Sequence, residues 1–403
     1  MSKTTIRVVT ESEEFESLAP VWNNLLEKGC DESTMYLTHE WLATWWQHFG
    51  EGQRSNLLLV ERDHRVIGIM PLVRNKYRLG PFKLDALESM GWPSRNYVGL
   101  MLPEDRQEVI SALLAYLKEN LHGVSLILRL SLIPVDSQFL GALKRGLASI
   151  SEDLAFKERV KTLAPYIDLP VSWEDYFGSL RGKRRRMLGR MLRNLEKEHG
   201  VVKFQQCDAD SLEEGLNRFF DLHQERWQAV GISGSFADPR VKELYREVAW
   251  KFLNRGWLYF SSMNVDGKLV SAMYGCIFNR KLYFIAAGRD IRYSKYSVGQ
   301  LHEMHVIKDA VSRNLSEFDF LQGDEPYKFY WTKSARRYMR VTIIKGGFLT
   351  ALRLQLLRAF LRLWDVRQYS LREICAILFM RRRERKELKK MGLSGQLNKL
   401  RRS

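Results

Sequence analysis

One order of predicted elements occurs twice along this chain of 403 residues: helices, a strand hairpin, a helix and a strand. Apolar residues at helical spacing and at alternating spacing identify the first copy. Its elements are helices within residues 14–50, strands over 56–61 and 66–74 around a turn at Asp63-His64, a helix over 104–120 and a strand over 124–132. Every second residue of that last strand is apolar, which is typical of a strand with one covered face.

The second copy begins at residue 210. The tripeptide Asp266-Gly267-Lys268 lies between two apolar strands and is a strong hairpin signal. The predicted elements are helices over 210–230 and 238–255, strands over 257–265, 269–278 and 281–287, a helix over 299–314 and a strand over 317–321. The two copies share little sequence, so the common order predicts an internal structural duplication within a mixed α/β fold.

The length of the chain and the positions of its prolines predict where its domains divide. A chain of 403 residues with 45% hydrophobic content can build two or three domains. Pro165 and Pro170 bracket an extended stretch between the two copies. We therefore predict an N-terminal domain over residues 1–165, a second domain over 166–349 and a basic helical tail over 350–403.

The net charge of +17 is concentrated in two segments. The tail over 350–403 holds fifteen Lys or Arg against four Asp or Glu, and residues 181–200 hold eight against two. The rest is nearly balanced, so the charge does not indicate a protein that binds nucleic acid over its whole surface. In the tail, apolar residues followed by a basic run at 381–386 are typical of an interfacial helix on an anionic membrane. The alternative is a helix packed on the protein with a solvated basic end.

Several classes of protein are excluded by composition. The four cysteines are far apart and the eight histidines are scattered, so we expect neither a disulfide framework nor a metal site. The first residues lack the apolar core of a secretory signal, and no run of eighteen apolar residues occurs. We therefore expect a cytoplasmic protein.

Residues 318–328, with the sequence FDFLQGDEPYK, are the segment of the chain that most resembles an active site. A predicted core strand ends in Gly323, and two carboxylates, a phenol and an ammonium group follow within five positions. A strand tip that delivers an acid, a base and a cation together is a common basis for an active site. The alternative is a hairpin turn whose charges are solvated and whose geometry is set by Pro326.

Four segments of the chain, taken in sequence order, resemble the GNAT-like acyltransferase domain of the CelD/BcsL family. This family is associated with cellulose and exopolysaccharide biosynthesis and is related to the Fem-type peptidyl transferases. One is the 318–328 segment itself. The others are LTHEWLATWWQHFG at 37–50 with GIMPL at 68–72, LRGKRRR at 180–186 continuing to Gly200, and GRD at 288–290 with YSVGQ at 296–300. The resemblance implies two tandem GNAT-like domains, with mixed central sheets flanked by helices and a basic tail added.

The resemblance also implies a mechanism by direct attack on a thioester. The donor would be acetyl-CoA or another acyl-CoA, held between splayed strands at 269–278 and 281–287, with N–H groups of the first polarising the carbonyl. The helix beginning near Gly299 would present its N-terminus to a phosphate of the donor. The implied donor-binding residues are Tyr296, Ser297, Val298, Gly299 and Gln300, although this segment is poorer in glycine than the loop of simpler GNAT enzymes.

Candidate site residues follow from the same resemblance. The candidate general base is Asp324 or Glu325, the candidate proton donor to the departing thiolate is Tyr327, and Asp319 is expected to point into the cleft. Candidate substrate-binding cations are Lys328, Arg289 and Arg186. The alternative for each residue is an ion pair that stabilises a turn, and for the stripe of Arg186, Arg190 and Arg193 it is a solvated helix face.

The expected function is therefore acyl transfer from acyl-CoA to an amine or hydroxyl of a sugar or of a bacterial cell-envelope or polysaccharide precursor. The enzyme would work in the cytoplasm, peripheral to the inner face of the membrane through residues 350–403. Three alternatives stay open: a Fem-like transferase that uses aminoacyl-tRNA, a non-catalytic polysaccharide-assembly factor, and a nucleic-acid-binding protein. Binding of RNA would weaken steeply with salt.

Overall fold

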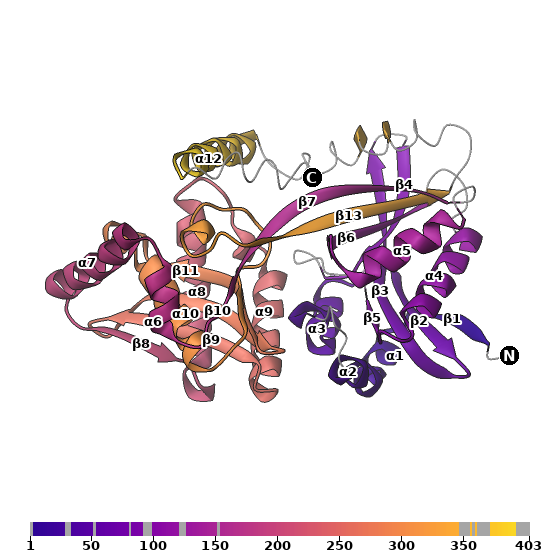
Figure 1. The fold of residues 1–403 in the computed structure, drawn as a ribbon, viewed down its shortest axis with the longest axis horizontal. Helices are drawn as coiled ribbons and strands as arrows, with labels where there is room; N and C mark the ends of the chain where they lie inside the picture. Colours follow the sequence, from indigo (N-terminus) through magenta and orange to yellow (C-terminus); the bar gives the residue numbers. More distant parts are fainter. Residues whose placement is uncertain are drawn as a thin grey trace. The chain divides into compact units, whose positions relative to one another are not determined.

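The computed structural model describes residues 3–28, 34–50, 54–79, 82–91, 99–120, 126–150, 154–345, 355–356, 359–360 and 371–391. Its internal contacts divide the chain into two compact units. Unit 1 comprises Met1–Thr162 with Arg336–Ser370 and Lys399–Ser403, and unit 2 comprises Leu163–Ala335 with Leu371–Asn398. Figure 1 shows the helices and strands of each unit.

Unit 1 is a mixed sheet with helices packed on it. Its elements are β1 (Thr4–Val9), α1 (Ser12–Ser17), α2 (Ala19–Glu27), η1 (Met35–Leu37), α3 (His39–Phe49), β2 (Arg54–Arg62), β3 (Arg65–Leu79), β4 (Phe82–Ser89), β5 (Leu100–Met101), α4 (Arg106–Asn120), β6 (Leu126–Pro134), α5 (Gln138–Ala148) and β13 (Ala335–Lys345). The strand order is β1-β2-β3-β4-β6-β13, with β5 on β3. Apolar faces of α4 and α5 pack with β2, β3 and β6 in one buried cluster.

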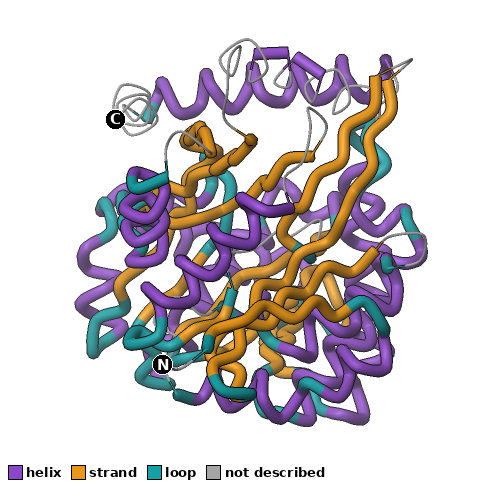
Figure 2. The backbone as a smooth tube through the Cα atoms, turned by 90° about the vertical axis from the view of Figure 1, so that its right-hand side faces the viewer, coloured by secondary structure: helices purple, strands orange, loops and turns teal. Residues whose placement is uncertain are grey.

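Unit 2 repeats this architecture. Its elements are the end of β7 (Leu154–Asp168), α6 (Trp173–Ser179), α7 (Gly182–His199), β8 (Val202–Gln206), α8 (Ala209–Gln228), η2 (Ser235–Ala237), α9 (Pro239–Asn254), β9 (Leu258–Val265), β10 (Lys268–Phe278), β11 (Lys281–Arg289), η3 (Ile291–Tyr296), α10 (Val298–Ser312), β12 (Glu317–Asp319), η4 (Lys328–Tyr330) and α12 (Leu371–Lys390). The strand order is β7-β12-β11-β10-β9-β8. Figure 1 shows helices on both sides of these strands, and Figure 2 colours the helices and strands of the chain separately.

The two units share one pattern of strand pairing. In unit 1 the pairs β1/β2, β2/β3 and β3/β4 are antiparallel, β4/β6 is parallel and β6/β13 is antiparallel. In unit 2 the pairs β8/β9, β9/β10 and β10/β11 are antiparallel, β11/β12 is parallel and β12/β7 is antiparallel. The sheet of unit 1 is completed by β13, which comes from outside the continuous segment Met1–Thr162. The expected mixed α/β class is confirmed.

Most predicted elements are present within a few residues of their expected bounds. The expected hairpins become β2/β3 and β9/β10, and the two expected helices before the second hairpin become α8 and α9. The strands β1, β4, β7, β8 and β13 were not predicted. In β7 the middle of the strand is largely exposed and carries mixed polar residues, so it lacks the apolar alternation that identifies a half-buried strand.

The basic tail is only partly described. The apolar residues of the predicted interfacial segment at 352–364 lie largely outside the described residues. In α12 the basic residues Arg381, Arg382 and Arg383 are exposed, Leu388 is buried, and Glu387 accepts a 3.0 Å hydrogen bond from the Tyr330 hydroxyl on η4. These contacts fit the packed alternative, and binding to a membrane surface stays a prediction. Among the described helices, none is long and apolar enough to cross a membrane.

Candidate functional site

The pairing of β11 with β12 ends early in unit 2, and we call the unpaired stretch beyond it the opening between β11 and β12. The two parallel strands pair only over Lys281↔Glu317, Leu282↔Phe318 and Tyr283↔Asp319. Beyond Tyr283 the strand β11 continues to Arg289, while the chain after β12 turns away toward Gly323, whose φ of 116° favours glycine. The edge of β11 beyond Tyr283 therefore no longer pairs with β12.

The expected splay between residues 269–278 and 281–287 is wrong. These segments are β10 and β11, which pair from Ser271↔Arg289 to Phe278↔Lys281 with one bulge at Tyr274/Gly275. A tight turn at Asn279-Arg280, with both residues at positive φ, keeps the two strands together. Because β10 also pairs with β9, its N–H groups are used within the sheet, and the free edge belongs to β11.

The N-terminus of α10 faces the end of β11. Ser297, at φ 53°, precedes the helix without a side-chain capping bond, and the first turn of α10 carries no acidic residue. Among the described residues, none accepts a hydrogen bond from the N–H groups of Val298 and Gly299. A Cβ atom on Gly299 would lie 3.3 Å from Cδ and 3.4 Å from Nη1 of Arg289. The glycine therefore lets this guanidinium lie against a helix end that attracts anions.

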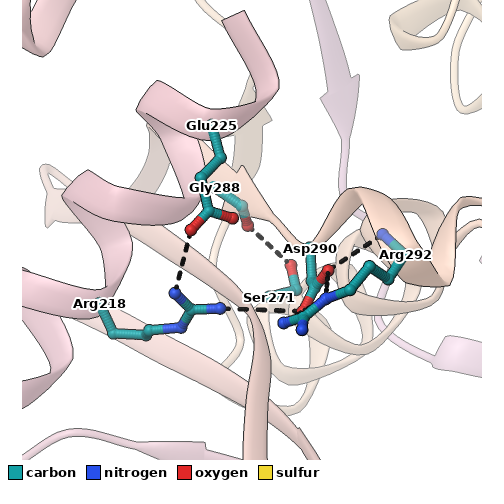
Figure 3. Close-up of polar contacts among 6 residues, drawn as sticks. All are labelled: Arg218, Glu225, Ser271, Gly288, Asp290 and Arg292. Atoms are coloured by element: carbon teal, nitrogen blue, oxygen red, sulfur yellow. Dashed lines mark hydrogen bonds and ion pairs between the residues drawn. The ribbon is translucent and has the colours of Figure 1, made fainter. Parts of the chain in front are cut away.

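The turn from β11 to α10 is held by the buried carboxylate of Asp290 (Figure 3). Arg292 binds it in bidentate fashion, with Nε 2.8 Å from Oδ1 and Nη2 2.5 Å from Oδ2, and Arg218 lies 3.8 Å away. Burial raises the pKa of Asp290, but the hydrogen bonds and charge of Arg292 outweigh it and hold the pKa below its usual value. Asp290 is thus a positioning residue for the turn.

The five predicted donor-binding residues divide into two groups. The Tyr296 hydroxyl donates to Glu198 at 2.6 Å, and Val298 is fully buried, so both side chains pack in the core. Ser297 and Gly299 lie at the N-terminus of α10, where their backbone groups can contact a ligand. Gln300 accepts a 2.5 Å hydrogen bond from Nη1 of Arg184 on α7. The segment therefore offers backbone groups rather than side chains to a ligand.

The turn after β12 is closed by two buried polar side chains. Oδ1 of Asp319 accepts a 2.7 Å bond from the N–H of Leu321, a residue at φ 57°. The ammonium group of Lys328 donates to the carbonyls of Gln322 at 2.8 Å and Gly323 at 3.4 Å and forms a 2.9 Å ion pair with Glu325. Lys328 is buried, so this geometry makes it a positioning residue rather than a substrate-binding cation.

Tyr327 and the two carboxylates before it lie at the surface of the same turn. Asp324, Glu325 and Tyr327 are half-buried. Burial raises the pKa of Tyr327 well above its usual value, and the charges of Glu325 and Glu303 raise it further. The phenol is therefore protonated at neutral pH and is available as a hydrogen-bond donor.

Glu303 on α10 was not predicted as a site residue. It is buried, and Oε2 accepts a 2.7 Å hydrogen bond from the indole of Trp331. Burial raises the pKa of Glu303 to about 7, against the lowering effects of Trp331, Arg289, Arg184 and Arg226. The sequence contained a signal for this residue, because Glu303 lies three and four positions before apolar residues of the same helix face.

A pocket of about 710 Å³ lies beside these residues within unit 2. Its walls come from α6, α7, η4 and the residues after η4, with Met391 at the end of α12. They include Tyr176, Arg184, Met187, Met191, Tyr330 and Trp331. The basic residues in its wall are Arg181, Lys183, Arg184 and Lys333, of which Arg184 is only 9% exposed. The predicted Arg186 is exposed and does not line the pocket.

The equivalent positions in unit 1 are already filled by protein groups. At the N-terminus of α4, the carboxylates of Asp105 and Glu108 form ion pairs of 2.9 and 2.8 Å with Arg62. On the parallel strands β4 and β6, the cross-strand neighbours Glu88 and Arg129 form a buried 2.7 Å ion pair. Unit 1 thus places acids where α10 of unit 2 leaves its N–H groups free.

A family model for the GNAT acetyltransferase domain matches residues 182–329. Unit 2 contains a GNAT-type domain. The matched segment begins at α7 and ends in η4, so it includes the opening between β11 and β12, the N-terminus of α10 and the turn at Gly323. It covers less than half of the chain, and the expected CelD/BcsL type is not confirmed.

Solved structures of other proteins are similar to this chain in fold. A crystal structure of FemX has a TM-score of 0.55 at 11% identity, covering 84% of this chain and 96% of that chain. The C-terminal domain of a putative lysylphosphatidylglycerol synthetase from Agrobacterium fabrum has a TM-score of 0.50 at 9% identity, covering 87% and 96%. A tandem GNAT protein from the clavulanic acid biosynthesis pathway has a TM-score of 0.43 at 11% sequence identity, covering 86% of this chain and 99% of that chain. No curated protein matches in sequence.

Among the described residues, no group of His, Cys, Asp and Glu could hold a metal ion. The described cysteines also differ from reactive thiols. Burial raises the pKa of Cys207 and raises that of Cys276 well above its usual value, so neither thiol has the lowered pKa of a cysteine nucleophile. His302 is buried between the hydroxyls of Ser261 and Ser271, at 2.8 and 3.0 Å, and is a packed core residue.

Proposed function

We propose that this protein transfers an acyl group from acyl-CoA to an amine or hydroxyl of a sugar or of a cell-envelope or polysaccharide precursor. The observation that carries this proposal is the opening between β11 and β12 beside an α10 N-terminus with unused N–H groups. An open strand edge and a free helix end can bind a thioester carbonyl and a phosphate at the same time. The match of residues 182–329 to a GNAT domain supports the same class of chemistry.

The donor would be held by unit 2 alone. The N-terminus of α10 and the guanidinium of Arg289 would bind its phosphates, and the acyl arm would lie along the edge of β11 beyond Tyr283. Backbone N–H groups of that edge would polarise the thioester carbonyl. Unit 1 offers no equivalent, because Asp105 and Glu108 place negative charge at the start of α4.

The reaction needs no covalent intermediate with the protein. The acceptor nitrogen or oxygen attacks the thioester carbonyl, and its proton passes to a carboxylate of the Asp324-Glu325 pair. The carbon–sulfur bond then breaks, and the departing thiolate takes a proton from the Tyr327 hydroxyl. Glu303 has a pKa nearer to that of a general base at neutral pH, but its carboxylate is buried against Trp331. We therefore assign it to positioning rather than to proton transfer.

A Fem-like transferase that uses aminoacyl-tRNA is the second candidate. One observation favours it: Arg186, Arg190 and Arg193 are all exposed on α7 and form a basic stripe that an RNA backbone could contact. The exposed Arg381, Arg382 and Arg383 of α12 are the residues that we propose for an anionic membrane surface. A non-catalytic assembly factor would retain these surfaces and lack turnover.

The donor is tested by measuring melting temperature against a series of acyl-CoAs, free coenzyme A and aminoacyl-tRNA analogues. A ligand that binds the folded protein raises the melting temperature with its free concentration relative to its Kd. We expect a rise with acyl-CoA. A rise with aminoacyl-tRNA alone would favour the second candidate, and no rise with any thioester would contradict the first.

The assignment of the base is tested with Asp324→Asn combined with Glu325→Gln. We expect kcat to fall about 100-fold or more, because general-base catalysis contributes about 100- to 10,000-fold. The matched control is Glu174→Gln combined with Asp175→Asn, an adjacent pair of exposed carboxylates on α6. Equal turnover of the two double variants, both folded, would remove the carboxylate pair from the mechanism.

A further inference from the structure

Two of the three guanidinium nitrogens of Arg184, Nε and Nη2, have no hydrogen-bond partner among the described residues although Arg184 is buried. Its Nη1 donates to Gln300 at 2.5 Å, but no partner among the described residues is recorded for Nε or Nη2, and both atoms are shielded from solvent. Nε–H and Nη2–H project from the same side of a guanidinium group as a parallel pair. This pair is the fork that binds a carboxylate or a phosphate in bidentate fashion.

The surroundings of Arg184 keep it charged without neutralising it. Burial lowers its pKa, and the nearby Glu303, Tyr330 and Tyr176 raise it, but no carboxylate forms an ion pair with its guanidinium among the described residues. Its Cζ atom lies 4.7 Å from the ring centre of Tyr330 and 4.8 Å from that of Trp331. Aromatic faces stabilise a cation but satisfy none of its N–H donors.

A buried cation with unpaired donors is costly unless an anion completes it. Arg184 lies in the wall of the pocket of about 710 Å³, a volume within the range of small-ligand sites. Met187 and Met191 add apolar surface to the same wall, and Lys183 and Lys333 add cationic groups. The pocket therefore suits a ligand with an anionic head and a partly apolar body.

We propose that this pocket binds an anionic group, a phosphoryl group or a carboxylate, through the Nε/Nη2 fork of Arg184, and that this group belongs to the acyl acceptor. The assignment to the acceptor rests on the proposed function, in which the α10 N-terminus and Arg289 serve the donor. Because the fork is shielded from solvent, binding includes a shift of a covering side chain. Tyr330 is the candidate, since its ring covers Arg184 and its hydroxyl is held by Glu387 of α12.

The experiment is calorimetric titration of the full-length protein with inorganic pyrophosphate and with citrate, with saturating coenzyme A present to occupy the donor site. The variants are Arg184→Met, which removes the charge and the fork, and Arg184→Lys, which keeps the charge and removes the fork. The matched control is Arg185→Met, because Arg185 is an exposed arginine one position along the same helix. Each variant is first checked for an unchanged melting transition.

We expect saturable binding of at least one of the two anions to the wild type. Affinity should fall about 10- to 100-fold in Arg184→Met and about 10-fold in Arg184→Lys, with a change of less than threefold in Arg185→Met. Binding of pyrophosphate alone identifies a phosphoryl group, and binding of citrate alone identifies a carboxylate.

Two results would overturn the inference. One is the absence of saturable anion binding to the wild type, and the other is equal loss of affinity in Arg184→Met and Arg185→Met, which would indicate general charge attraction. The donor is followed separately by titration with coenzyme A alone. Intact coenzyme A binding with anion binding insensitive to Arg184 would reject this pocket and leave the proposed function standing. Absence of coenzyme A binding, together with anion binding that depends on Arg184, would reject the proposed function and leave the anion-binding pocket standing.

Discussion

Tyr327 is the proposed proton donor to the departing thiolate. Burial and the charges of Glu325 and Glu303 keep its pKa well above the usual value, so the phenol holds its proton until the thiolate forms. We expect Tyr327→Phe to lower kcat about 100-fold and to leave the Kd for coenzyme A unchanged, because only the proton donor is lost. Steady-state kinetics and a coenzyme A titration measure the two quantities.

The control for Tyr327→Phe is Tyr293→Phe, at a half-buried tyrosine in η3. Removing that hydroxyl should change kcat less than threefold. If Tyr327→Phe also retains wild-type kcat over the whole pH range of activity, then the proton for the thiolate comes from another group.

Glu303 makes the stability of unit 2 depend on pH. The folded state holds its proton up to a pKa of about 7, whereas the unfolded chain releases it near the ordinary value of 4.5. The folded state therefore binds more protons between these values, and the free energy of unfolding falls as pH rises through this window. Glu303→Gln should remove this loss. We expect the variant to be more stable than the wild type at pH 8, by on the order of 3 kcal/mol at most, and equal to it at pH 4.

Chemical unfolding at several pH values from 4 to 8 tests this dependence. Glu196→Gln, at an exposed carboxylate on α7, is the control and should follow the wild type. Parallel curves for Glu303→Gln and the wild type would mean that the pKa of Glu303 is the same in the folded and unfolded states.

At the scale of elements, α8 approaches β11 closely enough to exclude any side chain at Gly288. A Cβ atom there would lie 2.8 Å from the carbonyl oxygen of Phe219, 2.9 Å from Cβ of Leu222 and 3.0 Å from the backbone nitrogen of His223. We expect Gly288→Ala to destabilise unit 2 by about 1–3 kcal/mol, because backbone atoms must move to admit the methyl group. Urea unfolding measures the change.

Gly178 in α6 is the matched control, because nothing lies within 4 Å of the Cβ position there. Gly178→Ala should be neutral or stabilising by up to about 1 kcal/mol, since alanine has the higher helix propensity. Equal changes in the free energy of unfolding for the two substitutions would show that α8 leaves room for a methyl group at position 288.

At the scale of the whole molecule, the two units share a strand-pairing pattern but differ at one helix end. Ser297 and Asp105 are the residues that precede α10 and α4, and only the second is acidic. We therefore expect one molecule of coenzyme A to bind per chain, not two, because a carboxylate at a helix N-terminus repels a phosphate. Isothermal titration calorimetry gives the stoichiometry directly.

Ser297→Asp converts the donor end of unit 2 into the arrangement of unit 1. Affinity for coenzyme A should fall at least about 10-fold in this variant and much less in Ser297→Asn, which has the same shape without the charge. A stoichiometry of two, or equal affinities of the two variants, would contradict the assignment of the donor to α10.

The amino-acid sequence by itself determined the order of elements and the class of the fold. Alternating apolar residues, helical apolar spacing and the Asp266-Gly267 turn are local signals, so hairpins and long helices were found near their actual bounds. The resemblance carried by residues 180–200 and 288–328 predicted a GNAT-like domain over residues 166–349, and the family model matches residues 182–329 within that range. The turn at Gly323 was predicted because its positive φ favours glycine, and a glycine is a signal that the local sequence carries.

Only the tertiary structure decided what each polar side chain does. The opening between β11 and β12 depends on where a ladder stops, which is a relation between strands that are separated by a whole helix. Lys328 was predicted to bind substrate but holds the carbonyls of its own turn. Glu303 was not predicted, and Arg184 was noted only within the basic segment at 180–186, although both side chains are buried. Burial and partner distance set the charge state and the free donors of such groups, and neither is fixed by neighbours in the sequence.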